Sequence, residues 1–217
     1  CSITLRSLHT TEFMNQRTTV GLVAFLALCA GIVGALYIAP PNVESQPEYF
    51  QTYPEPRALS PFSLTSHEGE VFDNSSLEGQ WSLVFVGYTF CPDVCPLDFA
   101  RNAQAVDLLA AQGHSATPVF ITVDPERDTP EVVGDFAYNN HEKAIGLTGT
   151  QEQVQVASRA YRTYYKAQDK SDEYYLVDHS TFSYLVLPEH GFVEYFRRDI
   201  SPEDMAARTA CFIEAAG

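Results

Sequence analysis

The sequence predicts an α/β protein in which a central mixed sheet is flanked by helices, preceded by one N-terminal transmembrane helix. From residue 62 onward, short apolar runs typical of buried strands alternate with segments of helical periodicity. The alternation ends in a hairpin and a closing helix, a layout typical of a thioredoxin-like sandwich. Residues 20–39 form an apolar run without charge, and about 20 such residues span a bilayer core.

These patterns divide the chain into four predicted segments: an N-terminal cytoplasmic segment (1–17), a transmembrane anchor (18–40), a linker (41–61) and a thioredoxin-like domain (62–217). The linker is rich in Pro, Glu, Gln and Tyr and lacks periodicity.

Arg6 and Arg17 precede the apolar run, so the positive-inside tendency places the N-terminus in the cytoplasm or matrix. A cleaved signal peptide is the alternative, but Tyr37 stands where cleavage favours a small residue. We therefore expect a single-pass protein of an inner membrane, with its C-terminal domain in the periplasm or the mitochondrial intermembrane space. The scarcity of arginine before the run favours a bacterial host.

The elements of the predicted domain follow in order along the chain. A short hairpin is expected at 62–65 and 71–72, and a second at 184–187 and 192–196. Buried strands are expected at 81–87, 118–123 and 145–147, and helices at 96–112, 129–140, 150–165 and after Ser201. Thr129 before Pro130 is typical of a helix N-terminus, and Thr150 with Gln153 of a capping box.

Acidic residues dominate the charge of the chain. Asp and Glu number 28 against 13 Lys and Arg, for a formal net charge of −15. Without a basic patch, such a surface argues against nucleic acid as a partner. It favours solubility, or else an electropositive protein partner.

Cys91-Pro92-Asp93-Val94-Cys95-Pro96 joins the predicted strand at 81–87 to the helix that follows. Proline is tolerated in a first helical turn, so Pro96 marks the helix start and Cys95 lies at its mouth. Both thiols then face the positive end of the helix dipole, which favours thiolates. Thiolates serve both disulfide exchange and metal binding. The alternative without a functional site is a structural disulfide, or two cysteines that are simply buried. A C-x2-C spacing would indicate redox work, whereas this wider loop leaves both chemistries open.

The other three cysteines are not expected to take part. Cys1 and Cys29 lie before or within the apolar run, and Cys211 is expected to be a small buried residue of the last helix.

His179 is the candidate for a third ligand. In a thioredoxin-like fold, its segment returns beside the helix mouth that holds the cysteines, at a place where thiol oxidoreductases carry a cis-proline. Here Ser180, Thr181 and Phe182 follow, and no proline does. Two thiolates and one imidazole suit copper, as Cu(I) or Cu(II). Structural zinc usually takes four protein ligands, and no fourth is evident. Metal loading would require both cysteines to be reduced.

At this point the chain resembles the Sco/SenC family of membrane-anchored copper chaperones for the dinuclear copper centre of cytochrome c oxidase. The resemblance rests on three segments in order: 87–96 with the cysteines, 124–130 (Asp-Pro-Glu-Arg-Asp-Thr-Pro) and 175–180 with the histidine. One departure is Phe90, where many members carry a histidine that is not a ligand.

The resemblance implies that Cys91, Cys95 and His179 bind copper. It also implies three protein partners: the oxidase subunit with the copper centre, a copper donor protein and a thiol reductant. We therefore expect a copper metallochaperone rather than an enzyme. The alternative is a thiol–disulfide oxidoreductase that reduces the cysteines of the oxidase copper site, with Cys91 attacking and Cys95 resolving. A peroxide-reducing enzyme on the same fold is a weaker third possibility.

Asp124 and Asp128 are expected at the sheet edge that carries the cysteine loop. They either shape the copper site or dock a partner, or else play structural roles. In the structural alternative, Asp128 or Thr129 caps the next helix and Arg127 pairs with a neighbouring acid. A carboxylate is a hard ligand that suits Cu(I) poorly, so neither is expected to bind the metal.

Overall fold

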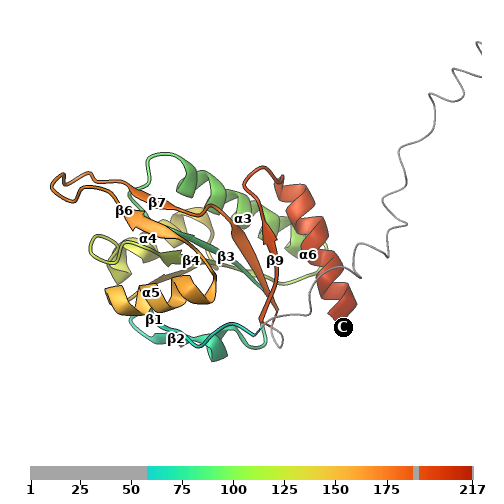
Figure 1. The fold of residues 1–217 in the computed structure, drawn as a ribbon. Helices are drawn as coiled ribbons and strands as arrows, with labels where there is room; N and C mark the ends of the chain where they lie inside the picture. The colour runs from blue at the N-terminus through green and yellow to red at the C-terminus, as the bar shows by residue number, and fades with distance from the viewer. Residues whose placement is uncertain (1–57, 188–190, 217) are drawn as a thin grey trace, which may run out of the picture. The chain divides into compact units, whose positions relative to one another are not determined.

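The computed structural model describes residues 58–187 and 191–216 (Figure 1). The segments expected at 1–17 and 18–40, and most of the linker expected at 41–61, lie outside the described residues. Within the part that the structure describes, no helix combines the length and the apolarity needed to cross a bilayer.

A seven-stranded mixed sheet forms the centre of the domain, in the order β2-β1-β5-β4-β3-β8-β9. The three middle strands β5, β4 and β3 are parallel, and every other pairing in the sheet is antiparallel. All six residues of β3 are buried, as expected for a strand that is covered on both faces. The strands are β1 (Ser63–Ser66), β2 (Val71–Asp73), β3 (Ser82–Gly87), β4 (Thr117–Thr122), β5 (Ile145–Thr148), β8 (Ser183–Leu187) and β9 (Gly191–Phe196).

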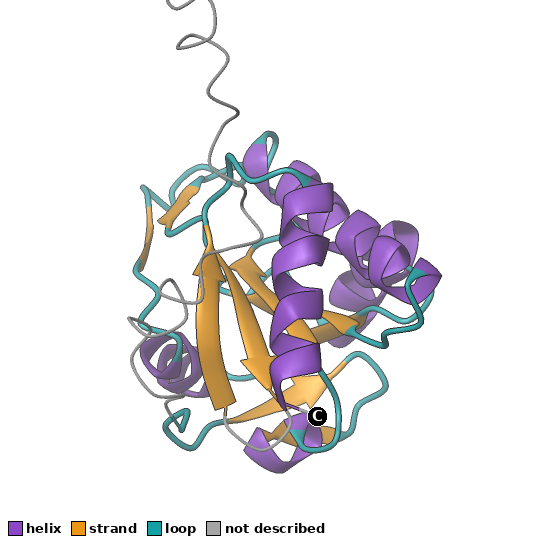
Figure 2. Cartoon of the chain, turned by 90° about the vertical axis from the view of Figure 1, so that its right-hand side faces the viewer, coloured by secondary structure: helices purple, strands orange, loops and turns teal. Residues whose placement is uncertain are grey.

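Helices lie on both sides of this sheet (Figure 2). Three of them, α3 (Val94–Ala111), α4 (Pro130–Asn140) and α6 (Pro202–Ala216), pack on one face, where Leu83, Leu109 and Met205 share a core. The other face is covered by α5 (Gln151–Ala160), and η2 (Asn74–Leu77) is a short 3-10 turn. The sheet with helices on both faces confirms the predicted α/β class and the thioredoxin-like layout.

An aromatic cluster joins α3 and α4 to the sheet. Phe120 of β4 lies with its ring centroid 5.5 Å from Phe99 and 4.6 Å from Phe136. Helix α4 also packs so closely on β5 that a Cβ at Gly146 would lie 2.3 Å from the Val133 carbonyl oxygen. This packing holds the segment before α4 against the end of β3, where the cysteine loop begins.

The predicted helix at 150–165 is too long. The capping box at Thr150 and Gln153 is present, but α5 ends at Ala160 and Arg162 has a φ of 53°. That left-handed conformation ends the helix. Tyr165 then begins a strand that the sequence did not predict, β6 (Tyr165–Ala167), which pairs with β7 (Val177–His179).

The prediction that Cys211 is buried is wrong, because its side chain is exposed on α6. The buried face of α6 consists of Met205, Ala206, Thr209 and Ala210. Successive helical residues are turned by about 100°, so Cys211 lies beyond the edge of that face.

Candidate metal centre

The cysteine loop runs from the end of β3 to the start of α3. Cys91 lies in the loop, and Cys95 lies in the first helical turn with no exposed surface. The Cys95 backbone N–H donates to Cys91 Sγ at 3.4 Å. A Cβ at Gly87 would lie 2.9 Å from Cys95 Sγ, so glycine at the strand end makes room for this sulfur.

His179 reaches the sulfurs from a separate hairpin. It ends β7, and β6 and β7 form a two-stranded sheet distinct from the central one. Its Nε2 lies 3.2 Å from Cys95 Sγ, and its ring stands edge-on to Tyr88 at 5.7 Å between centroids. Its Nδ1 lies 2.8 Å from the Ser180 carbonyl oxygen. Because a carbonyl oxygen only accepts, Nδ1 carries a proton and donates to it, and Nε2 is the ring nitrogen that faces the sulfur.

The structure brings together all three of the residues singled out in the sequence. Ligand atoms of Cys91, Cys95 and His179 all lie within 4.8 Å of one another. Among the described residues, this is the only group of three or more Cys, His, Asp or Glu side chains so placed. Two sulfurs and one imidazole nitrogen are a donor set that could hold a soft metal ion and leave a position open.

The two thiols differ in acidity. The pKa of Cys91 is lowered well below its ordinary value, first because the Cys95 thiol donates to it and then because backbone N–H groups face it. The pKa of Cys95 is raised, because it shares its proton with Cys91 and is buried. The expectation that the helix dipole favours both thiolates therefore holds for Cys91 and is wrong for Cys95. Cys95 Sγ therefore keeps its proton more readily than Cys91 Sγ does.

Alkylation should report this difference as a pH dependence. Cys91 is expected to react with iodoacetamide almost equally fast at about pH 8 and about pH 6, since its thiolate persists below the usual thiol pKa of about 8.5. The rate should fall only at more acidic pH, as the lowered pKa is reached. Peptide mass spectrometry gives the rate at each cysteine, with the protein unfolded in denaturant as the control. If the native rate at Cys91 drops as steeply as the unfolded one, the thiolate assignment is wrong.

Asp128 supports the cysteine loop through hydrogen bonds to Thr89. Its carboxylate is fully buried and accepts from the Thr89 N–H at 3.0 Å, from the Thr89 hydroxyl at 2.5 Å and from the Thr122 hydroxyl at 2.5 Å. Burial raises the pKa of this carboxyl, and these hydrogen bonds oppose the rise. Thr129 rather than Asp128 caps α4.

Asp124 pairs with Arg127, so the expected ion pair in this segment is present. Neither Asp124 nor Asp128 belongs to the three-ligand group.

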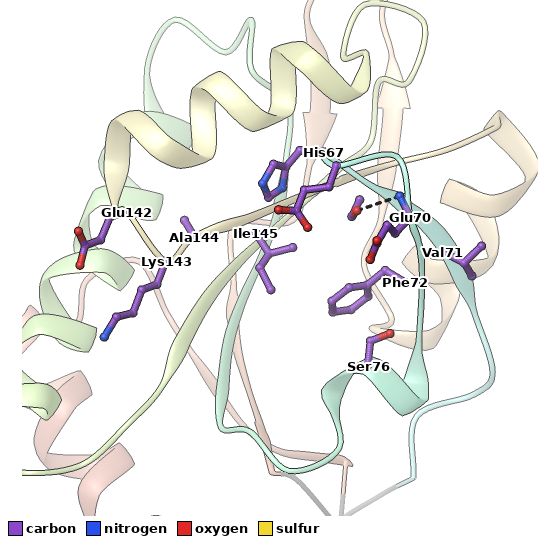
Figure 3. Close-up of a pocket in the computed structure, with 11 residues that line it drawn as sticks. His67, Glu70, Val71, Phe72, Ser76, Glu142, Lys143, Ala144 and Ile145 are labelled. Carbon is purple, nitrogen blue, oxygen red and sulfur yellow. Dashed lines mark hydrogen bonds between the residues drawn. The ribbon is translucent and has the colours of Figure 1, made fainter.

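A pocket of about 370 Å³ lies elsewhere, beside the β1–β2 hairpin (Figure 3). His67, Glu70, Phe72 and Ile145 are among its lining residues. The pocket lies at the start of β5, whereas the cysteine loop follows the end of β3. Because β3, β4 and β5 are parallel, these two places lie at opposite edges of the sheet. The pocket is therefore not part of the candidate metal centre.

Comparison with known proteins agrees with this geometry. The model of the SCO1/SenC family matches residues 51–214. The chain belongs to the SCO1/SenC family. It is 49% identical over 155 residues to the SenC protein of Rhodobacter capsulatus, covering 71% of this chain and 70% of SenC. It is 38% identical over 194 residues to the mitochondrial SCO1 homologue of Homo sapiens, covering 85% of this chain and 64% of the human protein.

Solved structures of family members share the fold. The structure of Arabidopsis thaliana ScoI with copper bound has a TM-score of 0.69 and 36% identity, covering 73% of this chain and 99% of that one. The structure of yeast Sco1 with copper bound has a TM-score of 0.67 and 32% identity, and the match covers 74% of this chain and 90% of that one. Structures of this family thus hold copper, and this chain has a Cys-Cys-His group that could hold a metal.

Proposed function

We propose that this protein is a copper metallochaperone for cytochrome c oxidase assembly. Copper is its cargo, bound by Cys91, Cys95 and His179 and delivered to the dinuclear centre of the oxidase. The observation that carries the proposal is the convergence of two sulfurs and one imidazole nitrogen within 4.8 Å, with the donor types that copper prefers. The copper-bound relatives support it.

The three residues would play unequal parts in loading. Cys91 offers a thiolate before the metal arrives, whereas Cys95 must first release its proton. His179 presents Nε2 to the cysteines, because its Nδ1 is engaged with the Ser180 carbonyl oxygen. With three protein ligands the ion keeps an open position, so a partner's ligands can enter one at a time. Phe90 and Leu97, both exposed beside the two cysteines in sequence, offer apolar surface for such a partner.

We further propose where the protein lies in the cell, from the sequence of the residues outside the described part. The apolar run at 20–39 would anchor the chain in an inner membrane, with residues 62–217 as the copper-binding domain on the periplasmic or intermembrane-space side. A copper donor and a thiol reductant would meet the domain there. The net charge of −15 suits encounters with electropositive partners.

A second candidate function rests on the asymmetry of the two thiols. A low-pKa cysteine beside a protonated one is the arrangement of a thiol–disulfide oxidoreductase. The Cys91 thiolate would attack a disulfide of the oxidase subunit and form a mixed disulfide, releasing one target thiolate. Cys95 would lose its proton, displace the second target thiolate and leave a Cys91–Cys95 disulfide. A thiol reductant would then restore both cysteines.

An anaerobic Cu(I) competition titration of the reduced domain, residues 42–217, tests the proposal. We expect tight one-to-one binding that weakens by about 100-fold in His179→Ala, because the only imidazole in the donor set is lost. His114→Ala is the matched control, since this histidine lies near Glu214 of α6 and outside the donor set. Weak binding by the wild type, or equal affinity in His179→Ala, would contradict the chaperone and favour the oxidoreductase.

A further inference from the structure

Three side chains tie the histidine hairpin to the segment before α4. The Tyr175 hydroxyl donates to Asp124 Oδ1 at 2.6 Å, and Arg127 Nε donates to Asp124 Oδ2 at 2.5 Å. The guanidinium carbon of Arg127 lies 3.6 Å from the centre of the Tyr175 ring. Each residue thus contacts the other two, and we call Tyr175, Asp124 and Arg127 the clamp.

Two of the three clamp residues, Asp124 and Tyr175, are buried, which strengthens the hydrogen bond between them. Asp124 is 3% exposed and Tyr175 is 8% exposed. Burial, with the neighbouring Asp124 carboxylate, raises the pKa of Tyr175 to about 12, so its hydroxyl keeps its proton and donates. An ion pair and a hydrogen bond on one buried carboxylate hold both partners in a defined geometry.

The same arginine reaches the cysteine loop. Its guanidinium carbon lies 4.9 Å from the ring centre of Phe90 and 5.9 Å from that of Tyr88. Phe90 directly precedes Cys91, and Asp128 binds Thr89 one residue earlier. The segment from Asp124 to Asp128 therefore touches both halves of the candidate metal centre.

The hairpin depends on such contacts for its position. Its two strands pair only with each other among the described strands, so the backbone ladder of the central sheet does not hold them. Tyr175 precedes His179 by four residues along an extended segment, a reach of about 13 Å. Anchoring at Tyr175 therefore limits where the imidazole can lie.

We propose that Tyr175, Asp124 and Arg127 are positioning residues that align His179 with the two cysteines. The inference rests on the proposed copper site and assigns these residues no contact with the metal. Loss of the Tyr175 hydroxyl would loosen the hairpin by removing its hydrogen bond to Asp124, while the ring stays stacked on Arg127. The thiols, which belong to the cysteine loop and α3, would keep their arrangement.

The first test uses the metal-free, reduced domain and the Tyr175→Phe variant. In the wild type, we expect nuclear Overhauser contacts between ring protons of His179 and Tyr88. These contacts should weaken strongly in Tyr175→Phe and persist in Tyr174→Phe, whose ring is exposed next in sequence. Contacts of full strength in Tyr175→Phe would overturn the proposal, whatever the copper results.

The second test is a double-mutant cycle of Cu(I) affinity by competition. Tyr175→Phe should weaken binding by about tenfold in the wild-type background, as expected for a residue that orients a ligand. In the His179→Ala background, it should have no effect, because the residue acts through the imidazole. A general loss of structure would give the same loss in both backgrounds and would overturn the proposal.

Arg127 is the second clamp residue that can be tested by a conservative substitution. Arg127→Lys keeps the charge beside Asp124 but loses the planar stack on Tyr175, so it should repeat the Tyr175→Phe pattern more weakly. If His179→Ala alone leaves Cu(I) affinity unchanged, the proposed function fails. The ring contacts of the metal-free protein still decide the role of the clamp in that case.

Discussion

Replacement of Cys95 by serine should abolish tight Cu(I) binding while the domain stays folded. Cys95 supplies one of only two sulfurs in the donor set and lies within reach of both other ligands. A serine hydroxyl is a hard ligand that does not suit Cu(I), so the affinity should fall by about three orders of magnitude or more. Serine is also slightly smaller than cysteine, so it fits beside Gly87.

Competition titration with a chromophoric Cu(I) chelator measures this loss, and Cys211→Ser provides the control. Cys211 is exposed on α6 and belongs to no metal-ligand group among the described residues, so its variant should bind like the wild type. Tight binding by Cys95→Ser would show that the metal is held elsewhere. Because an oxidoreductase also needs this thiol, the His179→Ala variant is required to separate the two functions.

Asp128→Ala is expected to cause the largest loss of folding stability among the residues around the site. It removes the acceptor for the Thr89 N–H, the Thr89 hydroxyl and the Thr122 hydroxyl, of which Thr122 is fully buried and Thr89 is half-buried. Each buried donor left without a partner costs about 1–3 kcal/mol, and relief of the buried carboxylate offsets part of this. We expect a net loss of about 3 kcal/mol in the free energy of unfolding.

Urea unfolding and thermal melts test this value, and a loss of about 3 kcal/mol corresponds to about 6–12 °C in Tm for a domain of this size. Asp135→Ala is the matched control, since it removes an exposed carboxylate from α4. The cysteine loop should also loosen in Asp128→Ala, which faster alkylation of the buried Cys95 would report. An unchanged midpoint would mean that the loop does not depend on Asp128.

Much of the fold and the identity of the three candidate ligands could be predicted from the sequence. Buried strands such as β3 are apolar without interruption, and the caps at Thr129 and Thr150 are local signals. His179 carries no local signal that marks it as a ligand. It could be singled out because the predicted fold brings its segment back to the helix that holds the cysteines, and because segment 175–180 resembles the family's.

Other features depend on tertiary contacts that no local pattern carries. The strands β6 and β7 have three residues each, and the helix predicted at 150–165 extended over the start of β6. The bond between Tyr175 and Asp124 joins residues 51 apart in the chain. Likewise, the different protonation of Cys91 and Cys95 follows from burial and proton sharing, which the spacing of the cysteines does not reveal.

The candidate centre is divided between two parts of the molecule with different local stability. The cysteines belong to the junction of β3 and α3, which is bound into the central sheet and its helices. His179 belongs to a two-stranded hairpin that shares no strand pairing with that sheet and is held instead by side-chain packing, with Val177 buried in the core. In the proposed copper site, loss of the third ligand would thus require a rearrangement of the hairpin and its side-chain contacts, while the strand pairing of the central sheet stays intact. The proposed delivery of copper would then begin at His179, with both cysteines still in place at the end of β3 and the start of α3.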